Sequence, residues 1–190
     1  MTEPKEHADL LAIPDDGRPL LLVDVDGVLN AVNRSQNAKV YNIFKAGATQ
    51  PGKGFTIRFR HELGDWLAEL AEHYHLVWCT TWDDLANTEL SPRLGLPELP
   101  VIPCVERDIY PPTIHLAHFK QGVVERYVGD RPYAWIDDDF DTRRDLDWAY
   151  LRTERGVPTK ILPIRGSAGL QRHHVDKLIA WAISLRGGVR

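Results

Sequence analysis

The stretch LLLVDVDG at residues 20–27 decides the fold. Its first half is a continuous apolar run that stops at Asp24, which is typical of a strand buried on both faces of a parallel sheet. Gly27 ends the run and indicates a turn. We therefore expect a buried β-strand that delivers two carboxylates, those of Asp24 and Asp26, to the turn that follows it.

The same pattern, an apolar run that ends in polar residues, returns twice along the chain. Residues 76–79 end at Thr80, and residues 133–136 end at three consecutive aspartates, 137–139. Apolar residues at helical spacing separate the runs, for example between 63 and 70. This alternation predicts an α/β domain, a three-layer Rossmann-like fold with a mostly parallel sheet and helices on both faces. Further helices are expected at 83–94, 118–127, 142–155 and 171–185, and further strands at 100–102 and 160–163.

Residues 40–60 have a different pattern, because two short strand-like segments flank a turn rich in glycine and proline. They predict a small β-hairpin that forms a flap. Residues 1–19 contain three prolines and show no apolar periodicity, so we expect a leader before a single domain at 20–190.

Composition narrows the class of protein. The chain has 190 residues, 43% of them hydrophobic, and six are Trp, which is enough for one globular domain. No run approaches the roughly 18 apolar residues of a membrane span, and the polar first residues do not resemble a signal peptide. We therefore expect a cytoplasmic protein without membrane contact. The net charge of −4 argues against wrapping of duplex DNA.

Acidic clusters follow two of the predicted strands, Asp24 with Asp26 and Asp137 with Asp138. The carboxyl ends of parallel strands line the ligand crevice of such a sheet, so these side chains are expected to meet. Two carboxylates about 4 Å apart repel each other by roughly 1 kcal/mol in water and roughly 4 kcal/mol at an effective dielectric of 20. Mg²⁺ would relieve this repulsion, since it binds carboxylate, water and phosphate oxygens. The pattern predicts a magnesium and phosphate site.

Two further residues are expected at the same crevice. Thr80 ends the strand at 76–79, where its hydroxyl and the backbone N–H groups after it would hold a phosphate oxygen. Lys120 lies near the start of the helix that leads to the strand at 133–136, so its ammonium group would reach the acids.

Taken in order, these segments resemble the four motifs of the haloacid dehalogenase-like (HAD) hydrolase superfamily. LLVDVDGVL at 21–29 resembles the first motif, VWCT at 77–80 the second, Lys120 the third and IDD at 136–138 the fourth. Val28 is a departure, because many members carry Thr at that position. The four motifs in this order imply a HAD-like hydrolase.

The resemblance also implies roles for these residues. Asp24 would be the nucleophile that forms an aspartyl-phosphate, and Asp26 would be the general acid and base. Thr80 and Lys120 would hold phosphate oxygens. Dehalogenases and transport ATPases of the superfamily lack an acid at the position of Asp26, so a phosphatase is implied. The implied Mg²⁺ ligands are Asp24, Asp26 through its backbone carbonyl, and Asp137 or Asp138.

Cap domains select the substrate in this superfamily. Only 53 residues separate Asp26 from Thr80, and 39 separate Thr80 from Lys120, which leaves no room for a large cap. An open site favours phosphate on a nucleotide, a nucleic-acid end or a phosphoprotein, and disfavours a phosphomutase, which needs closure against water. The sequence is also compatible with a homo-oligomer in which a second subunit covers the site.

A finer resemblance connects the chain with capless HAD domains of RNA-repair proteins and bacterial polynucleotide phosphatases. It rests on VWCTTW at 77–82, DLAN at 84–87 and AWIDDD at 134–139. It implies a phosphorylated nucleic-acid end as substrate, with Trp82 either stacked on a base or packed in the core. The basic side chains that would meet the nucleic-acid backbone are Lys53, Arg58, Arg60, Arg143 and Arg144.

Two other classes use similar residues. A phosphorelay receiver domain also gathers acids, Thr and Lys on an α/β sheet, but its acidic pair precedes the acceptor Asp and its Lys comes last, which is not the order here. The alternative that stays open is a catalytically idle HAD-like module that binds a phosphorylated partner. Its expected signature is the loss of Asp24 or Asp26, and both are present.

Overall fold

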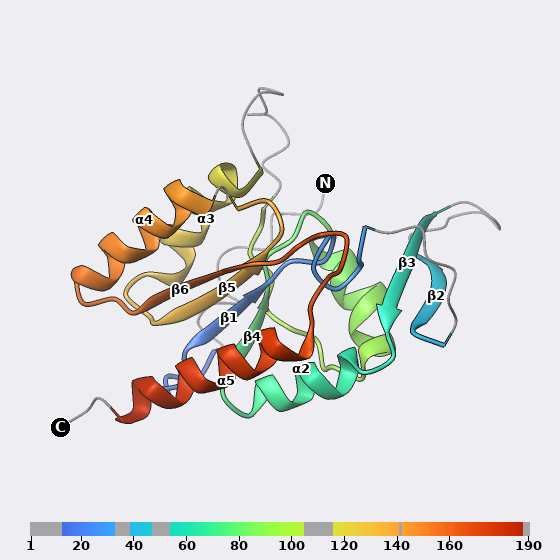
Figure 1. Cartoon of the computed structure of the whole chain (residues 1–190), viewed down its shortest axis with the longest axis horizontal. Helices are drawn as coiled ribbons and strands as arrows, with labels where there is room; N and C mark the ends of the chain where they lie inside the picture. Colours follow the sequence, from blue (N-terminus) through green and yellow to red (C-terminus); the bar gives the residue numbers. More distant parts are fainter. Residues whose placement is uncertain (1–12, 33–38, 47–53, 105–115, 141, 188–190) are drawn as a thin grey trace, which may run out of the picture.

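A four-stranded parallel sheet forms the centre of the computed structural model (Figure 1). The strand order is β4-β1-β5-β6, so β1 is paired on both sides. The strands are β1 (Leu20–Val23), β4 (His75–Trp78), β5 (Tyr133–Asp137) and β6 (Thr159–Pro163). The structure describes residues 13–32, 39–46, 54–104, 116–140 and 142–187.

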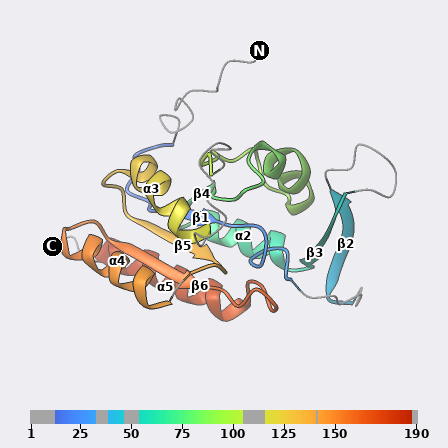
Figure 2. The same cartoon turned by 90° about the horizontal axis from the view of Figure 1, so that it is seen from above.

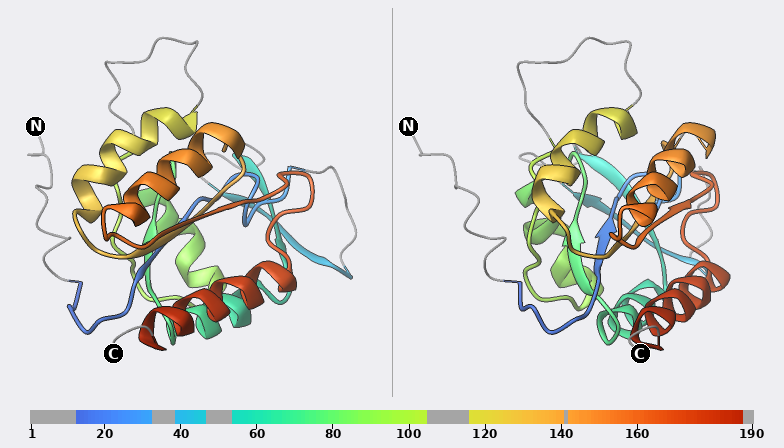
Figure 3. Two further views of the ribbon diagram at one scale, coloured as in Figure 1. Left: turned by 60° about the vertical axis from the view of Figure 1, so that its left-hand side comes forward. Right: turned by 90° about the vertical axis from the view of Figure 1, so that its left-hand side faces the viewer.

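Two layers of helices cover the sheet, because side chains of each strand alternate between its faces. Leu21 and Val23 of β1 lie in the core on the side of α2 and α5, and Leu20 and Leu22 lie in the core on the side of α3 and α4. Figure 3 shows the sheet between these two helix pairs. The helices are α2 (Leu63–Ala71), α3 (Leu116–Val128), α4 (Thr142–Glu154) and α5 (Arg172–Gly187). The predicted three-layer Rossmann-like fold is confirmed, and the described residues contain no large cap domain.

The predicted hairpin is a separate two-stranded antiparallel sheet of β2 (Tyr41–Ala46) and β3 (Phe55–Arg60). Ile57 and Phe59 of β3 are buried against the main core. The hairpin stands beyond the carboxyl ends of the parallel strands (Figure 2). Its turn, with Lys53, lies outside the described residues.

The helix predicted at 83–94 is present, but it is not a regular α-helix. The segment forms a π-helix, η1 (Ala86–Leu90), and then a 3₁₀ helix, η2 (Ser91–Leu94). Pro92 at the start of η2 has no N–H to continue an α-helical ladder. The Asn87 amide instead holds the following loop, because its Oδ1 accepts the Leu99 N–H at 2.9 Å. The edge strand predicted at 100–102 is reduced to a single bridge between Val101 and Trp78.

The described part of the expected leader, residues 13–19, lies against the domain. Ile13 is buried in the core on the α3 side. Asp16 Oδ1 is 2.8 Å from Nε2 of His75, and the Arg18 guanidinium donates to the carbonyl of Ala71 at 3.0 Å. No helix in the described ranges combines the length and the apolar character that crossing a membrane requires.

Candidate active site

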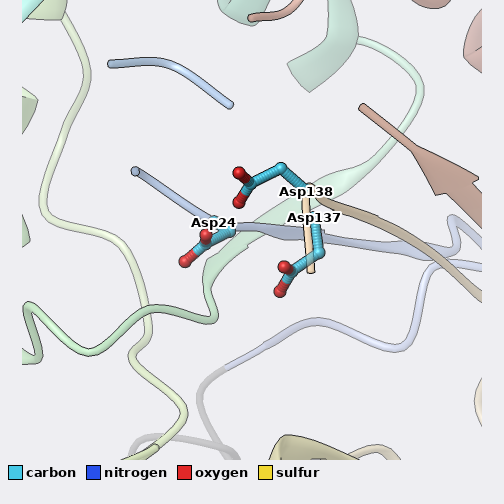
Figure 4. A group of neighbouring side chains, drawn as sticks. All are labelled: Asp24, Asp137 and Asp138. Carbon is cyan, nitrogen blue, oxygen red and sulfur yellow. The ribbon is translucent and has the colours of Figure 1, made fainter. Parts of the chain in front are cut away.

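Three carboxylates meet where β1 and β5 end. The pairing of Val23 with Ile136 places Asp24 next to Asp137, the last residue of β5. One oxygen each of Asp24, Asp137 and Asp138 lies within 4.8 Å of the others. In Figure 4 the three side chains leave the ends of two neighbouring strands, and Asp137 and Asp138 extend to opposite sides of their chain. Such a group of oxygen donors can hold a metal ion.

Lys120 of α3 lies between two of these acids. Its Nζ is 3.1 Å from Asp24 Oδ1 and 2.7 Å from Asp137 Oδ2, and its side chain is 4% exposed. Burial alone would lower the pKa of Lys120, but the charges of Asp24 and Asp137 raise that pKa well above its ordinary value. The ammonium group therefore stays charged and offsets part of the repulsion among the carboxylates.

Asp137 and Asp138 have different surroundings. Asp137 is fully buried and uses both carboxylate oxygens inside the protein: Oδ2 accepts from Lys120, and Oδ1 accepts from the backbone N–H of Asp139 at 3.0 Å. Asp138 is half-buried between two glycines. A Cβ at Gly27 would come within 2.0 Å of its Cγ, and one at Gly166 within 2.4 Å of its Oδ2. Asp138 is thus the better placed ligand for a cation, and Asp137 anchors Lys120.

The surroundings also shift the acids toward their protonated forms. Burial raises the pKa of Asp24 to about 8, with Lys120 opposing the shift and the Asp137 carboxylate adding to it. Burial, with the charges of Asp139 and Asp137, raises the pKa of Asp138 to about 6. Without a cation, the cluster keeps protons that exposed carboxylates would release, and a bound cation would displace them.

Thr80 and Asp26 lie at the same end of the sheet. Thr80 is buried, and its Oγ1 accepts the backbone N–H of Trp82 at 3.4 Å. Asp26 is exposed, and its carboxylate accepts from Asn30 Nδ2 at 2.9 Å and from Trp82 Nε1 at 2.8 Å. The Asp26 side chain is not one of the three carboxylates that meet, so only its backbone carbonyl stays a predicted cation ligand.

Sequence reasoning missed Asn30 and left the role of Trp82 open. Trp82 is 8% exposed with its indole N–H bound to Asp26, so its ring is packed in this structure, as one of the two alternatives has it. Asn30 carries no motif signal other than its place in the turn after Gly27. Its contact with Asp26 becomes visible only in three dimensions.

One family model matches most of the chain. It is described as the HAD domain in Swiss Army Knife RNA repair proteins, and it matches residues 20–175. That range begins at β1, ends within α5 and includes all the residues of the cluster. No curated protein matches the chain.

Gly27 should be essential to the position of Asp138. Its φ is +72°, and a Cβ would overlap the Asp138 carboxylate. Gly156, with φ of +87° and nothing within 4 Å of a Cβ, is a matched control for backbone strain alone. We expect Gly156→Ala to lower the free energy of unfolding by roughly 1–2 kcal/mol, and Gly27→Ala to lose roughly 1–3 kcal/mol more through crowding. Urea denaturation measures both, and equal losses would show that Asp138 is not confined by Gly27.

Proposed function

Because the chain belongs to the family of HAD domains in Swiss Army Knife RNA repair proteins, we propose that it is a Mg²⁺-dependent phosphomonoesterase that acts on a phosphorylated nucleic-acid end. The observation that carries the proposal is the ion-paired group of Asp24, Lys120 and Asp137 at the carboxyl ends of β1 and β5. It combines a carboxylate nucleophile with a fixed cation for phosphate oxygens.

A divalent cation fits the donor set. The three carboxylates approach within 4.8 Å of one another and offer only oxygen, which Mg²⁺ prefers. Asp24 and Asp138 would hold the ion together with the Asp26 carbonyl, while Asp137 keeps Lys120 beside it. When bound, the ion would neutralise charge on the phosphate and on the carboxylates.

The first step transfers the phosphoryl group to the protein. An oxygen of the ionised Asp24 carboxylate attacks phosphorus, and the bond from phosphorus to the ester oxygen breaks. Asp26 donates a proton to that leaving oxygen. Lys120, Thr80 and the backbone N–H groups after Thr80 hold the phosphoryl oxygens as negative charge spreads over them. The products are an alcohol and an aspartyl-phosphate at residue 24.

The second step regenerates the protein. Water attacks phosphorus, and Asp26, now a carboxylate, takes a proton from it. The bond between phosphorus and the Asp24 oxygen breaks, which releases inorganic phosphate. The exposed position of Asp26 gives water access to this step.

The hairpin supports a nucleic-acid substrate. Residues opposite each other in an antiparallel pair share a face, so the pairings of Ile43 with Arg58 and of Lys45 with Thr56 place both basic residues on one face. That face is opposite to the one that packs Ile57 in the core. The Arg58 backbone N–H donates to Asn30 Oδ1 at 3.0 Å, so the basic face begins next to the turn that carries Asp26. In an oligonucleotide, the phosphates next to the terminal phosphate would contact this basic face.

Phosphate release from a panel tests the reaction. We expect Mg²⁺-dependent turnover of p-nitrophenyl phosphate and of 3'- or 5'-phosphorylated oligonucleotides, with a preference for one oligonucleotide end over nucleoside monophosphates and phosphopeptides. Asp24→Asn should abolish turnover, because an amide is not a nucleophile. Asp147→Asn, at an exposed position on α4, should leave it unchanged. A folded protein that releases phosphate from no substrate would favour the idle binding module.

The affinity for Mg²⁺ should depend on pH. Between the ordinary Asp pKa of 3.8 and the raised pKa of about 8 for Asp24, the cation-free folded state binds a proton that the unfolded state has lost. The stability of the cation-free protein therefore falls as pH rises through this window. Mg²⁺ must displace the proton, so its affinity should rise by up to about tenfold per pH unit between pH 6 and 8. Calorimetry in buffers of different ionisation enthalpy counts the released protons, and a pH-independent affinity would contradict the pKa shift.

The hairpin should contribute to oligonucleotide binding and not to chemistry. We expect the Lys45→Ala, Arg58→Ala double variant to raise KM for the oligonucleotide and to weaken its dependence on salt, because phosphate contacts are lost. The kinetics on p-nitrophenyl phosphate should not change. Lys177→Ala with Arg186→Ala on α5 removes the same charge from exposed positions. If both double variants raise KM equally, the hairpin is not the binding face.

A further inference from the structure

The carboxylate of Asp26 is held by two side chains from different parts of the chain. Asn30 Nδ2 donates to Asp26 Oδ1 at 2.9 Å, and Trp82 Nε1 donates to Asp26 Oδ2 at 2.8 Å. One neutral donor on each oxygen fixes the rotation of a carboxylate that is otherwise exposed to solvent. Asp26, Asn30 and Trp82 are thus separate from the group of three carboxylates formed by Asp24, Asp137 and Asp138.

Asn30 is itself fixed at several atoms. Its backbone N–H donates to Val25 O at 2.8 Å, and its carbonyl accepts the N–H of Gly27 at 2.9 Å, which closes the turn after β1. Its side-chain Oδ1 accepts the backbone N–H of Arg58 at 3.0 Å. The amide of Asn30 therefore uses its oxygen on the hairpin and its nitrogen on Asp26, and it joins the two.

Trp82 is fixed in a comparable way from the other side of the site. Its ring is buried, and its backbone N–H donates to Thr80 Oγ1. The next residue, Asp83, has a φ of +46°, a left-handed conformation that costs energy for a residue with a side chain. The chain turns sharply directly after the residue whose indole reaches Asp26.

We propose that Asn30 and Trp82 are positioning residues that aim the Asp26 carboxyl group at the leaving oxygen. This inference rests on the proposed function and adds to it the groups that orient the general acid. Their loss affects proton donation and leaves the attack of Asp24 on phosphorus intact. Because Asn30 also contacts β3, the orientation of the Asp26 carboxyl group depends on the position of that strand. The basic face of β3 is the one that would contact the substrate.

Substrates with different leaving groups distinguish a positioning role of Asn30 and Trp82 from a purely structural role. A p-nitrophenolate leaves without protonation, whereas an alkoxide such as a ribose oxygen needs a proton from the general acid. The parameter to compare is kcat/KM, because it reports the steps up to transfer of the phosphoryl group and excludes later hydrolysis of the aspartyl-phosphate.

We expect Asn30→Ala and Trp82→Phe to lower kcat/KM roughly 10- to 100-fold on an alkyl phosphate or a phosphorylated oligonucleotide. On p-nitrophenyl phosphate the loss should be less than about threefold. Two variants serve as matched controls: Asn42→Ala, at an exposed position on β2, and Trp148→Phe, which removes an indole bond to Glu125 on the other side of the sheet. Both controls should keep the wild-type ratio between the two substrates.

A double variant adds a second readout. In the Asp26→Asn background, Asn30→Ala should cause little further loss on the alkyl phosphate, since both changes remove the same proton transfer. Equal losses on both substrates, or a full additional loss in the Asp26→Asn background, would overturn the positioning role while the phosphatase reaction stands. A wild-type protein that hydrolyses neither substrate would instead refute the proposed function.

Discussion

The contact of the Lys120 ammonium with Asp24 and Asp137 is the interaction on which the site depends. It joins α3 to the ends of the two central strands, and it places an ammonium group and two carboxyl groups where water is almost excluded. A buried charge without its partner costs several kcal/mol, so each of the three keeps the other two in place. The carboxyl groups of Asp24 and Asp137, with that of Asp138 beside them, outnumber the single ammonium group and would favour a bound cation. Lys120 and such a cation together would offset the negative charge of a phosphate.

Much of the fold could be predicted because its signals are local. The apolar runs ending at Asp24, Thr80 and Asp137 are buried on both faces in the parallel sheet, and turn residues delimit the hairpin. The segment at 86–94 was not predictable as a π-helix and a 3₁₀ helix, because its form depends on contacts of Asn87 with a loop twelve residues later. The predicted helix formed there, and these contacts and Pro92 determined its type.

The candidate site, like the fold, was predictable from the sequence only in part. The strand ends predicted that Asp24, Asp137 and Asp138 would be neighbours, but not that the Asp26 side chain would lie outside this group. The position of Lys120 near the start of its helix predicted that its side chain would reach the acids. Three consecutive aspartates did not show that Asp137 and Asp138 have different surroundings. The surroundings of Asp138 come from Gly27 and Gly166, which are distant in sequence and adjacent in space. The bond from Trp82 to Asp26 spans 56 residues of sequence, and no local pattern encodes it.

Chemical trapping of the phosphorylated protein tests the central claim most directly. Borohydride reduces an aspartyl-phosphate to homoserine, so quenching the protein with borohydride during turnover and sequencing its peptides by mass spectrometry identifies the nucleophile. The account predicts homoserine at residue 24 only when Mg²⁺ and a phosphorylated substrate are both present, and none in Asp24→Asn. Turnover without modification of Asp24, or trapping at a different residue, would contradict it.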